Sequence, residues 1–213
     1  MRLTKDVKAV IFDYGEVLCH APTPTEIERL AGFFGISVDQ LATLWERNRG
    51  LYDRGDLRPE IYWSMLAQDA AVEITPSHIE QICELDLTMW SNINAAMVKW
   101  AQELRSSGMK VGLLSNMHPQ MVTHCRKQCP WLESFDFLTF SGEVRMIKPD
   151  PAIYEHTLLG LGVTASEALF LDDREVNIRA AEGLGINAFR FRSMAQLRSD
   201  LQVAGFPHLP TVS

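Results

Sequence analysis

Four short runs of mostly apolar residues constrain the fold of this chain more than any other feature of its sequence. They cover residues 9–12, 110–114, 168–171 and 186–191, and a weaker fifth candidate covers residues 137–140. The runs show no regular alternation of apolar and polar positions, which is typical of strands buried on both faces of a parallel sheet. Helical patterns lie between them from residue 93 onward. The sequence therefore predicts an α/β fold with a doubly wound parallel sheet.

The stretch between the first and second predicted strands is much longer than a crossover helix requires. It contains helix start signals instead of strands: two capping boxes, Thr23 to Glu26 and Ser37 to Gln40, and a Thr75-Pro76 helix start. We interpret residues 19–88 as a small all-helical domain inserted above the carboxyl end of the first strand. Residues 1–18 and 89–213 then form the α/β core domain.

Composition excludes several classes of protein and partner. The 213 residues are 46% hydrophobic and 22% charged, so the chain can bury a core and is not disordered. A formal net charge of −7 offers no basic surface, so we expect neither nucleic acid nor a membrane as a partner. A small anionic substrate stays compatible where local positive charge holds it. A monomer and a homodimer both remain open.

Neither a secretion signal nor a membrane span is predicted. The apolar run near the N-terminus, residues 9–12, falls short of the roughly 7–15 residues of a signal sequence. No stretch reaches the roughly 18 apolar residues of a membrane span. We therefore expect a cytoplasmic protein. The four cysteines form no Cys-x-x-Cys pair and no zinc-like spacing with histidine, and we interpret Cys125 and Cys129 as buried thiols.

Polar residues follow three of the predicted strands. Asp13 follows the first, Ser115-Asn116 ends the second, and Asp172-Asp173 follows the fourth. Ligands of open parallel sheets bind beyond the carboxyl ends of the strands. We therefore expect these groups, together with Lys148, to lie close together at one edge of the sheet.

Carboxylates gathered in this way repel one another and raise each other's pKa unless a cation joins them. A set of aspartate oxygens suits Mg²⁺, which favours one or two carboxylates and the oxygens of a substrate phosphate. With Lys148, such an ion would hold a phosphate dianion and leave Asp13 free to attack it. Ser115 would donate a hydrogen bond to a phosphate oxygen. Asn177, near the start of the next helix, would fix the loop of Asp172 and Asp173.

Four segments of the chain resemble the ordered motifs of the haloacid dehalogenase (HAD) superfamily. They are residues 12–18 (FDYGEVL), 114–116 (LSN), 148–151 (KPDP) and 171–177 (LDDREVN). The resemblance extends from about residue 8 to residue 192. The helical insertion is similar to the C1 cap of that family.

This resemblance implies a role for each matching residue. Asp13 would be the nucleophile and would form an aspartyl-phosphate intermediate. Mg²⁺ would be held by Asp13, by Asp172 and by the backbone carbonyl of Gly15, with Asp173 supporting the metal shell. Ser115 and Lys148 would bind the transferring phosphoryl group. We expect Asn116 to bind substrate as well. The resemblance thus predicts a phosphatase of small phosphorylated metabolites.

One position departs from the motif of the family's phosphatases. They usually carry a general acid two residues after the nucleophile, where this chain has Gly15. The sequence around it is similar to a subgroup that includes bacterial glucose-1-phosphate phosphatases, which also have glycine there. We therefore predict a preference for leaving groups that depart easily, such as those of anomeric sugar phosphates or acyl phosphates. A second hypothesis is that Glu16 or His20 replaces the missing acid.

Substrate contacts from the insertion are harder to predict. Five of its residues offer charge or an aromatic face, and we place Arg54 among the substrate-binding residues; the five are Arg47, Arg49, Tyr52, Arg54 and Trp63. An arrangement in which the arginines are solvated and the aromatics form a helix-bundle core explains them equally well. We expect His118 to lie on the surface at a helix start.

Two other functions remain as alternatives. A 2-haloacid dehalogenase would use the same aspartate without metal. However, family dehalogenases have small polar residues in place of Asp172 and Asp173. The negative charges of these two aspartates would repel a halocarboxylate. A catalytically idle binding module is the second alternative, and only the glycine at position 15 favours it.

Overall fold

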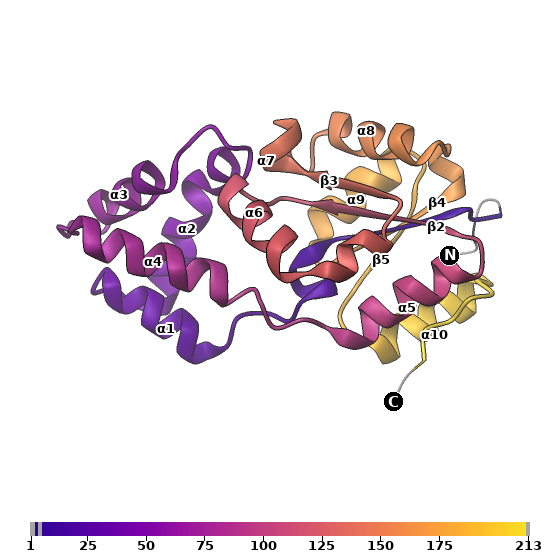
Figure 1. Cartoon of the computed structure of the whole chain (residues 1–213), viewed down its shortest axis with the longest axis horizontal. Coiled ribbons are helices and arrows are strands. Elements are labelled where there is room, and N and C mark those ends of the chain that lie inside the picture. The colour runs from indigo at the N-terminus through magenta and orange to yellow at the C-terminus, as the bar shows by residue number, and fades with distance from the viewer. Residues whose placement is uncertain (1–2, 4–5, 212–213) are drawn as a thin grey trace.

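A five-stranded parallel sheet forms the centre of the molecule in the computed structural model, which describes residues 3 and 6–211. The order of the strands is β3-β2-β1-β4-β5, so the chain winds outward from β1 in both directions (Figure 1). The doubly wound α/β prediction is confirmed, and the weaker fifth candidate is a full strand. The strands are β1 (Ala9–Phe12), β2 (Lys110–Ser115), β3 (Phe137–Phe140), β4 (Ala168–Asp172) and β5 (Asn187–Arg190).

Both faces of the sheet are covered by helices. Val10 and Phe12 of β1 point into one hydrophobic cluster, while Ala9 and Ile11 point into another, because successive side chains of a strand alternate between faces. This explains why the strand sequences are apolar without alternation. The first cluster packs against α5 (Ala95–Ser106), α6 (Pro119–Gln128) and α10 (Met194–Ala204), and the second against α8 (Pro151–Leu161) and α9 (Glu175–Gly183).

The register of the sheet aligns the ends of three strands. Phe12 of β1 lies opposite Leu113 of β2 and opposite Leu171 of β4. Asp13 therefore leaves the sheet beside Ser115 and Asp172, as the strand ends predict. A short helix, α7 (Ser141–Val144), follows β3 at the same edge.

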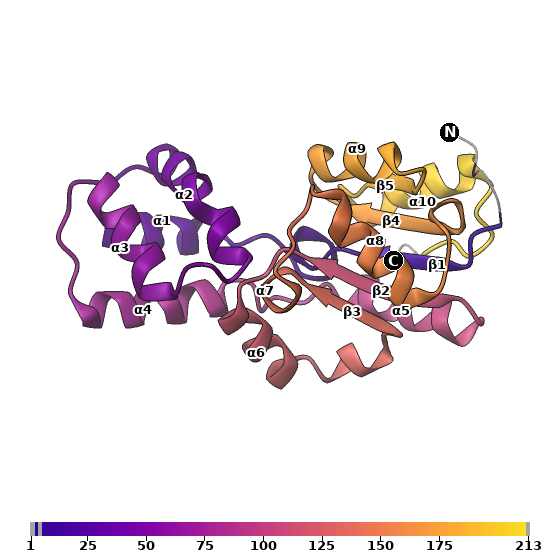
Figure 2. The same ribbon diagram turned by 90° about the horizontal axis from the view of Figure 1, so that it is seen from above.

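Residues 24–88 form a four-helix unit with its own hydrophobic cluster. Capping boxes begin α1, α2 and α4 at Thr23, Ser37 and Thr75, where the sequence predicts helix starts. Figure 2 shows this unit to one side of the sheet. Its helices are α1 (Pro24–Phe33), α2 (Val38–Asp53), α3 (Pro59–Asp69) and α4 (Pro76–Thr88).

Two chain segments connect the helical unit to the sheet, and they run side by side. Cys19 and Ile93 form an isolated antiparallel bridge. The backbone N–H of His20 donates to the carbonyl of Asn92 at 2.7 Å, and that of Asn94 donates to Leu18 at 2.9 Å. These bonds tie the entry and exit of the insertion together at the carboxyl end of β1.

Two sequence interpretations of single residues can be compared with the fold. The prediction that His118 lies on the surface is wrong, because its side chain is fully buried under the insertion. His118 is the N-cap of α6, as expected, and its Nδ1 accepts from the N–H of Met121. Cys125 and Cys129 are both buried free thiols, as expected, with Cys129 at the C-cap of α6. Among the described residues, no helix combines the length and the apolar content that crossing a membrane demands.

Candidate functional site

Asp13 sits where β1 ends and the backbone turns away from the sheet. Its N–H donates to the carbonyl of Leu171 at 2.9 Å, which continues the pairing of β1 with β4 by one residue. Its Oδ1 accepts from the N–H of Tyr14 at 2.7 Å. The position of this carboxylate is thus set by the sheet and by the following turn.

Three carboxylates and one ammonium group meet at this edge. Oxygens of Asp13, Asp172 and Asp173 lie within 4.8 Å of one another. The Nζ of Lys148 lies 2.8 Å from Asp13 Oδ1 and 2.7 Å from Asp172 Oδ2, and it also donates to the carbonyl of Leu114 at 3.0 Å. All three hydrogens of the ammonium group therefore have an acceptor.

One lysine does not balance this cluster. Burial raises the pKa of Asp13 to about 8, with further contributions from Asp172 and Asp173, and the opposing charge of Lys148 only limits the rise. Burial and the charge of Asp172 likewise raise the pKa of Asp173 to about 6. Burial alone would favour the neutral amine of Lys148, but Asp13 and Asp172 hold its pKa above the ordinary value. The site is short of positive charge.

A divalent oxygen-binding cation fits this deficit. The three aspartates offer only oxygen donors, with neither histidine nor cysteine among them, and this donor set suits Mg²⁺. Gly15 lines the same cavity. The residues expected from the sequence to hold a magnesium ion are therefore brought together here.

The loop after β4 is held in place by its own helix. Asn177 Nδ2 lies 3.0 Å from both carboxylate oxygens of Asp172, and the N–H of Arg174 donates to Asp172 Oδ1 at 2.8 Å. These bonds explain how Asp172 stays fully buried at the strand end. Asn177 fixes this loop as its position in the sequence suggests.

Ser115 is the last residue of β2 and Asn116 follows it, and both line the cavity. The side chain of Asn116 has a use that the sequence does not reveal. Its Oδ1 accepts from the N–H of Lys148 at 2.8 Å, and its Nδ2 donates to the carbonyl of Lys148 at 3.0 Å. Its polar atoms therefore clamp the backbone of Lys148 and so position the ammonium group. Asn116 also lines the cavity, and its contact with substrate stays a prediction.

A cavity of about 270 Å³ lies between this edge and the helical insertion. The core side contributes the groups described above together with Glu16 and Arg174. The residues that line it from the insertion and its exit segment are Trp45, Glu46, Arg49, Asp53 and Trp90.

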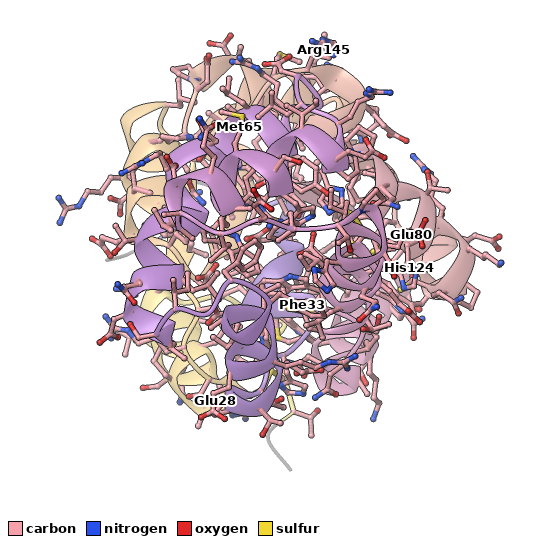
Figure 3. The ribbon with its side chains drawn as sticks, turned by 90° about the vertical axis from the view of Figure 1, so that its left-hand side faces the viewer. Glu28, Phe33, Met65, Glu80, His124 and Arg145 are labelled. Carbon is pink, nitrogen blue, oxygen red and sulfur yellow. The ribbon has the colours of Figure 1, made fainter. Side chains whose placement is uncertain are left out.

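Arg54 is not among the residues that line this cavity, contrary to expectation. Its guanidinium pairs with Asp56 at 2.5 Å across the tight turn that Gly55 forms at φ +80°. Arg145, labelled at the top of Figure 3, lies on the outside of the molecule in that view. It pairs with the same carboxylate. Arg54 therefore pairs within the insertion, with a carboxylate that Arg145 of the core also contacts. Arg49, five residues earlier on α2, reaches the cavity instead.

The other candidates from the insertion were predicted either to contact substrate or to form a solvated face and a helix-bundle core, and each can now be placed. Tyr52 and Trp63 are buried in the hydrophobic cluster of the insertion, and Arg47 forms an exposed pair with Asp69. Arg49 alone of the five lines the cavity. The spacing of Arg49 and Asp53, one helical turn apart, is the signal that would have found this pair.

The face of the cavity beside Gly15 is aromatic. A Cβ at Gly15 would lie 3.7 Å from the ring of Trp90, and the backbone of Gly15 has φ −62°, which any residue adopts. The hydroxyl of Tyr14 donates to the carbonyl of Trp90 at 2.9 Å and fixes it there. Glu16 also lines the cavity, with its backbone at φ +55°, whereas His20 does not.

Residues 7–185 match the model of a protein family described as haloacid dehalogenase-like hydrolase. The chain is 26% identical to a sesquiterpene phosphatase of Aspergillus oryzae over 84% of this chain and 87% of that protein. It is 23% identical to an (S)-2-haloacid dehalogenase of Burkholderia cepacia over 88% and 84% of the two chains. A longer relative, a drimenol cyclase of Aspergillus calidoustus, is matched over only 36% of its length.

Solved structures share the fold. A HAD-family enzyme of Bacteroides thetaiotaomicron, an aspartate-to-alanine mutant crystallised with magnesium and inorganic phosphate, superimposes with a TM-score of 0.70 at 20% identity. The match covers 87% of this chain and 94% of that one. The arrangement of sheet and helical insertion is therefore one that known enzymes possess.

Proposed function

The chain belongs to the haloacid dehalogenase-like hydrolases, and within that family we propose that it is a Mg²⁺-dependent phosphatase of small phosphorylated metabolites. One observation carries the proposal: Asp13, Asp172 and Asp173 converge with Lys148 on a cavity where positive charge is deficient. A metal ion and a lysine beside a buried carboxylate form a site that attracts a phosphate dianion. The phosphatase relative supports this assignment.

In the proposed reaction, an oxygen of Asp13 attacks the phosphorus and the bond from phosphorus to the leaving-group oxygen breaks. Lys148 and Ser115 stabilise the charge on the transferring group by hydrogen bonds. Water then attacks the phosphorus of the aspartyl-phosphate and the bond from phosphorus to the Asp13 oxygen breaks, which releases inorganic phosphate and restores the carboxylate. Over the two steps, the leaving-group oxygen gains one proton and water gives one up. Asp13, Asp172 and the backbone carbonyl of Gly15, with support from Asp173, would hold a Mg²⁺ ion, which would supply positive charge that keeps the nucleophile ionised and offsets the negative charge of the phosphate.

The leaving group receives less help than in phosphatases with an acid two residues after the nucleophile. A general acid contributes roughly 10²–10⁴-fold to such reactions, and here Gly15 faces the ring of Trp90. We therefore propose substrates whose leaving group departs easily, with anomeric sugar phosphates such as glucose 1-phosphate as the first candidates. Glu16 is the cavity-lining carboxylate next to Gly15 that stays a candidate proton donor.

The helical unit has the position of a cap in this proposal. Residues 19–88 form the cap domain, and residues 1–18 and 89–213 form the core domain. Helix α2 of the cap supplies Trp45, Glu46, Arg49 and Asp53 to the wall opposite Asp13. A cavity of about 270 Å³ suits small metabolites better than long-chain ones.

A panel of phosphorylated metabolites, assayed with Mg²⁺ and with a chelator, tests this function. We expect Mg²⁺-dependent release of phosphate from a small set of compounds, with anomeric sugar phosphates ahead of simple alkyl phosphates. Equal rates on both groups would contradict the leaving-group preference. No turnover of any phosphate ester would favour the idle binding module.

Dehalogenation is the second function to test, because one relative is a dehalogenase. Here Asp172 and Asp173 lie next to Asp13 and would repel a halocarboxylate. We expect no chloride release from 2-chloropropionate in metal-free buffer. Release at a rate that exceeds phosphate-ester turnover would overturn the phosphatase assignment.

A further inference from the structure

The charges on the cap side of the cavity indicate what the substrate carries besides its phosphate. Two cations line this part of the wall, Arg49 from α2 and Arg174 from the loop after β4. A substrate with a second anionic group would need one of them to be available. Both are already paired with carboxylates that line the same cavity, Asp53 and Glu46.

Arg49 is enclosed by its partners. Its Nε lies 2.9 and 3.1 Å from the two oxygens of Asp53, and one terminal nitrogen lies 3.6 Å from Asp86 Oδ1. The guanidinium also packs against the rings of Trp45 and Tyr52, at 5.2 and 5.5 Å from their centres. Only 15% of this side chain is exposed.

Asp86, the second carboxylate beside Arg49, is held in place by a residue of the core. Asp86 is completely buried, and its Oδ2 lies 3.1 Å from Nε2 of His118. Because Nδ1 of His118 accepts from the N–H of Met121, Nε2 is the ring nitrogen that carries the hydrogen. Burial alone would raise the pKa of Asp86, but Arg49 and His118 outweigh it and hold this pKa below the ordinary value. Arg49 therefore has an ionised carboxylate, Asp86, beside it in addition to its pair with Asp53.

Arg174 is balanced at the mouth of the cavity. Its guanidinium lies 3.3 Å from Glu46 Oε2, in a pair that joins core and cap. Both side chains are more than half exposed, so the pair is weaker than that of Arg49. Glu46 still places a negative charge beside Arg174. Among the described residues, Arg174 is the only cation besides Arg49 on this part of the wall.

We infer that the site selects phosphate monoesters whose remaining part is uncharged, and that Asp53 and Glu46 are the specificity-determining residues that reject a second anion. The inference rests on the proposed phosphatase function. The rings of Trp45 and Trp90 supply apolar surface for the substrate, and the paired charges supply hydrogen-bonding groups for hydroxyls. Sugar and polyol phosphates meet this requirement, whereas bisphosphates and phosphorylated carboxylic acids do not.

A matched pair of compounds tests this inference. Glucose 1-phosphate and glucuronic acid 1-phosphate have the same anomeric leaving oxygen and differ in a carboxylate on the ring. We expect kcat/KM for the glucuronic acid compound to be lower by about 10-fold or more, since like charges brought together oppose binding. In the Asp13→Asn variant with Mg²⁺, calorimetric titration should give the same order of affinity without turnover.

Variants identify the residues responsible. Glu46→Gln, a change at an exposed position, and Asp53→Asn should each reduce the ratio of kcat/KM for glucose 1-phosphate to kcat/KM for glucuronic acid 1-phosphate several-fold. Asp69→Asn, which frees Arg47 away from the cavity, is the matched control and should leave the ratio unchanged. Equal kcat/KM for both compounds in the wild-type protein, or a ratio unmoved by Glu46→Gln and Asp53→Asn, would overturn the inference.

The binding measurement separates this inference from the proposed function. Preferential binding of glucose 1-phosphate without turnover of any phosphate ester would support the selectivity and contradict the phosphatase. Turnover of both compounds at equal rates would support the phosphatase and contradict the selectivity. Binding of neither compound would count against both.

Discussion

Two buried charge clusters lie on opposite sides of the cavity, and they are built in different ways. In the core, Lys148 contacts Asp13 and Asp172, with Asp173 close by. In the cap, Arg49 contacts Asp53 and Asp86. Each cluster has one cation and more than one carboxylate. The different pKa values of their carboxylates therefore come from what surrounds each cluster.

The surroundings give the clusters opposite tasks. In the core, burial and mutual repulsion raise the pKa of Asp13 to about 8, and its carboxylate lines the cavity. In the cap, Asp86 is fully enclosed, and Arg49 and His118 overcome the effect of burial and hold its pKa low. The core cluster therefore has capacity for a further cation and a phosphate, whereas in the cap cluster the cation Arg49 is already paired and helps to hold the wall in place.

Replacing Asp13, the proposed nucleophile, should have the largest effect. We expect Asp13→Asn to lower kcat/KM for any phosphate substrate by at least about 10³-fold, because no other group replaces an attacking carboxylate. Thermal unfolding should show that the variant stays folded, since the asparagine is nearly isosteric. Retention of more than a tenth of the activity would remove Asp13 from the mechanism.

The cap cluster should matter for stability. Asp86→Asn leaves Arg49 with only part of its compensation, and we expect a loss of about 3–5 kcal/mol in the free energy of unfolding at neutral pH. Because the pKa of Asp86 is lowered in the folded state, its contribution is present above its ordinary value of 3.8 and is lost as the pH falls below it. Denaturant unfolding at several pH values should show the two proteins converging in acid.

Asp69→Asn is the matched control for this stability change, because Asp69 also pairs with an arginine of α2 but at the surface. We expect it to change the free energy of unfolding by less than about 1 kcal/mol. A loss as large as that of Asp86→Asn would show that burial is not what separates the two pairs.

Restoring an acid beside the nucleophile should sharpen the role of the open core cluster. Gly15→Asp places a carboxyl group against Trp90 on a backbone that accepts it. We expect kcat/KM for alkyl phosphates to rise by about 10- to 100-fold relative to aryl phosphates, a part of the full effect of a general acid. Gly15→Asn has the same size without the proton and should not produce this change. The same gain in both variants would contradict the account.

Loosening Lys148 should have the smallest effect of the four. Asn116→Ala removes two hydrogen bonds to the backbone of Lys148 but leaves its ammonium group. We expect a fall in kcat of about 10-fold with little change in KM, because poor positioning of a catalytic group acts mainly in the transition state. A rise in KM with kcat unchanged would show instead that Asn116 acts by binding substrate.

Local patterns predicted the core of the molecule well. Unbroken apolar runs mark strands buried on both sides, and the groups at their ends share an edge because parallel strands end together. Phe12, Leu113 and Leu171 are aligned in the register, so Asp13 and Asp172 were predictable as neighbours.

The cap side of the site was not predictable in the same way. Whether Arg49 or Arg54 reaches the cavity depends on how α2 is rotated and on the turn at Gly55. His118 follows the usual pattern of a surface helix start, and only the packing of the insertion above α6 buries it. Such contacts join residues far apart in the chain, and neither periodicity nor capping signals encode them.

The central claim is that Asp13 accepts the phosphoryl group. Acid quenching during turnover of a substrate with Mg²⁺, followed by mass spectrometry of the peptides, tests it most directly. We predict a phosphorylated peptide that contains Asp13, formed within a single turnover and absent from the Asp13→Asn variant. Full turnover with Asp13 unmodified, or with the phosphate on another residue, would contradict the claim.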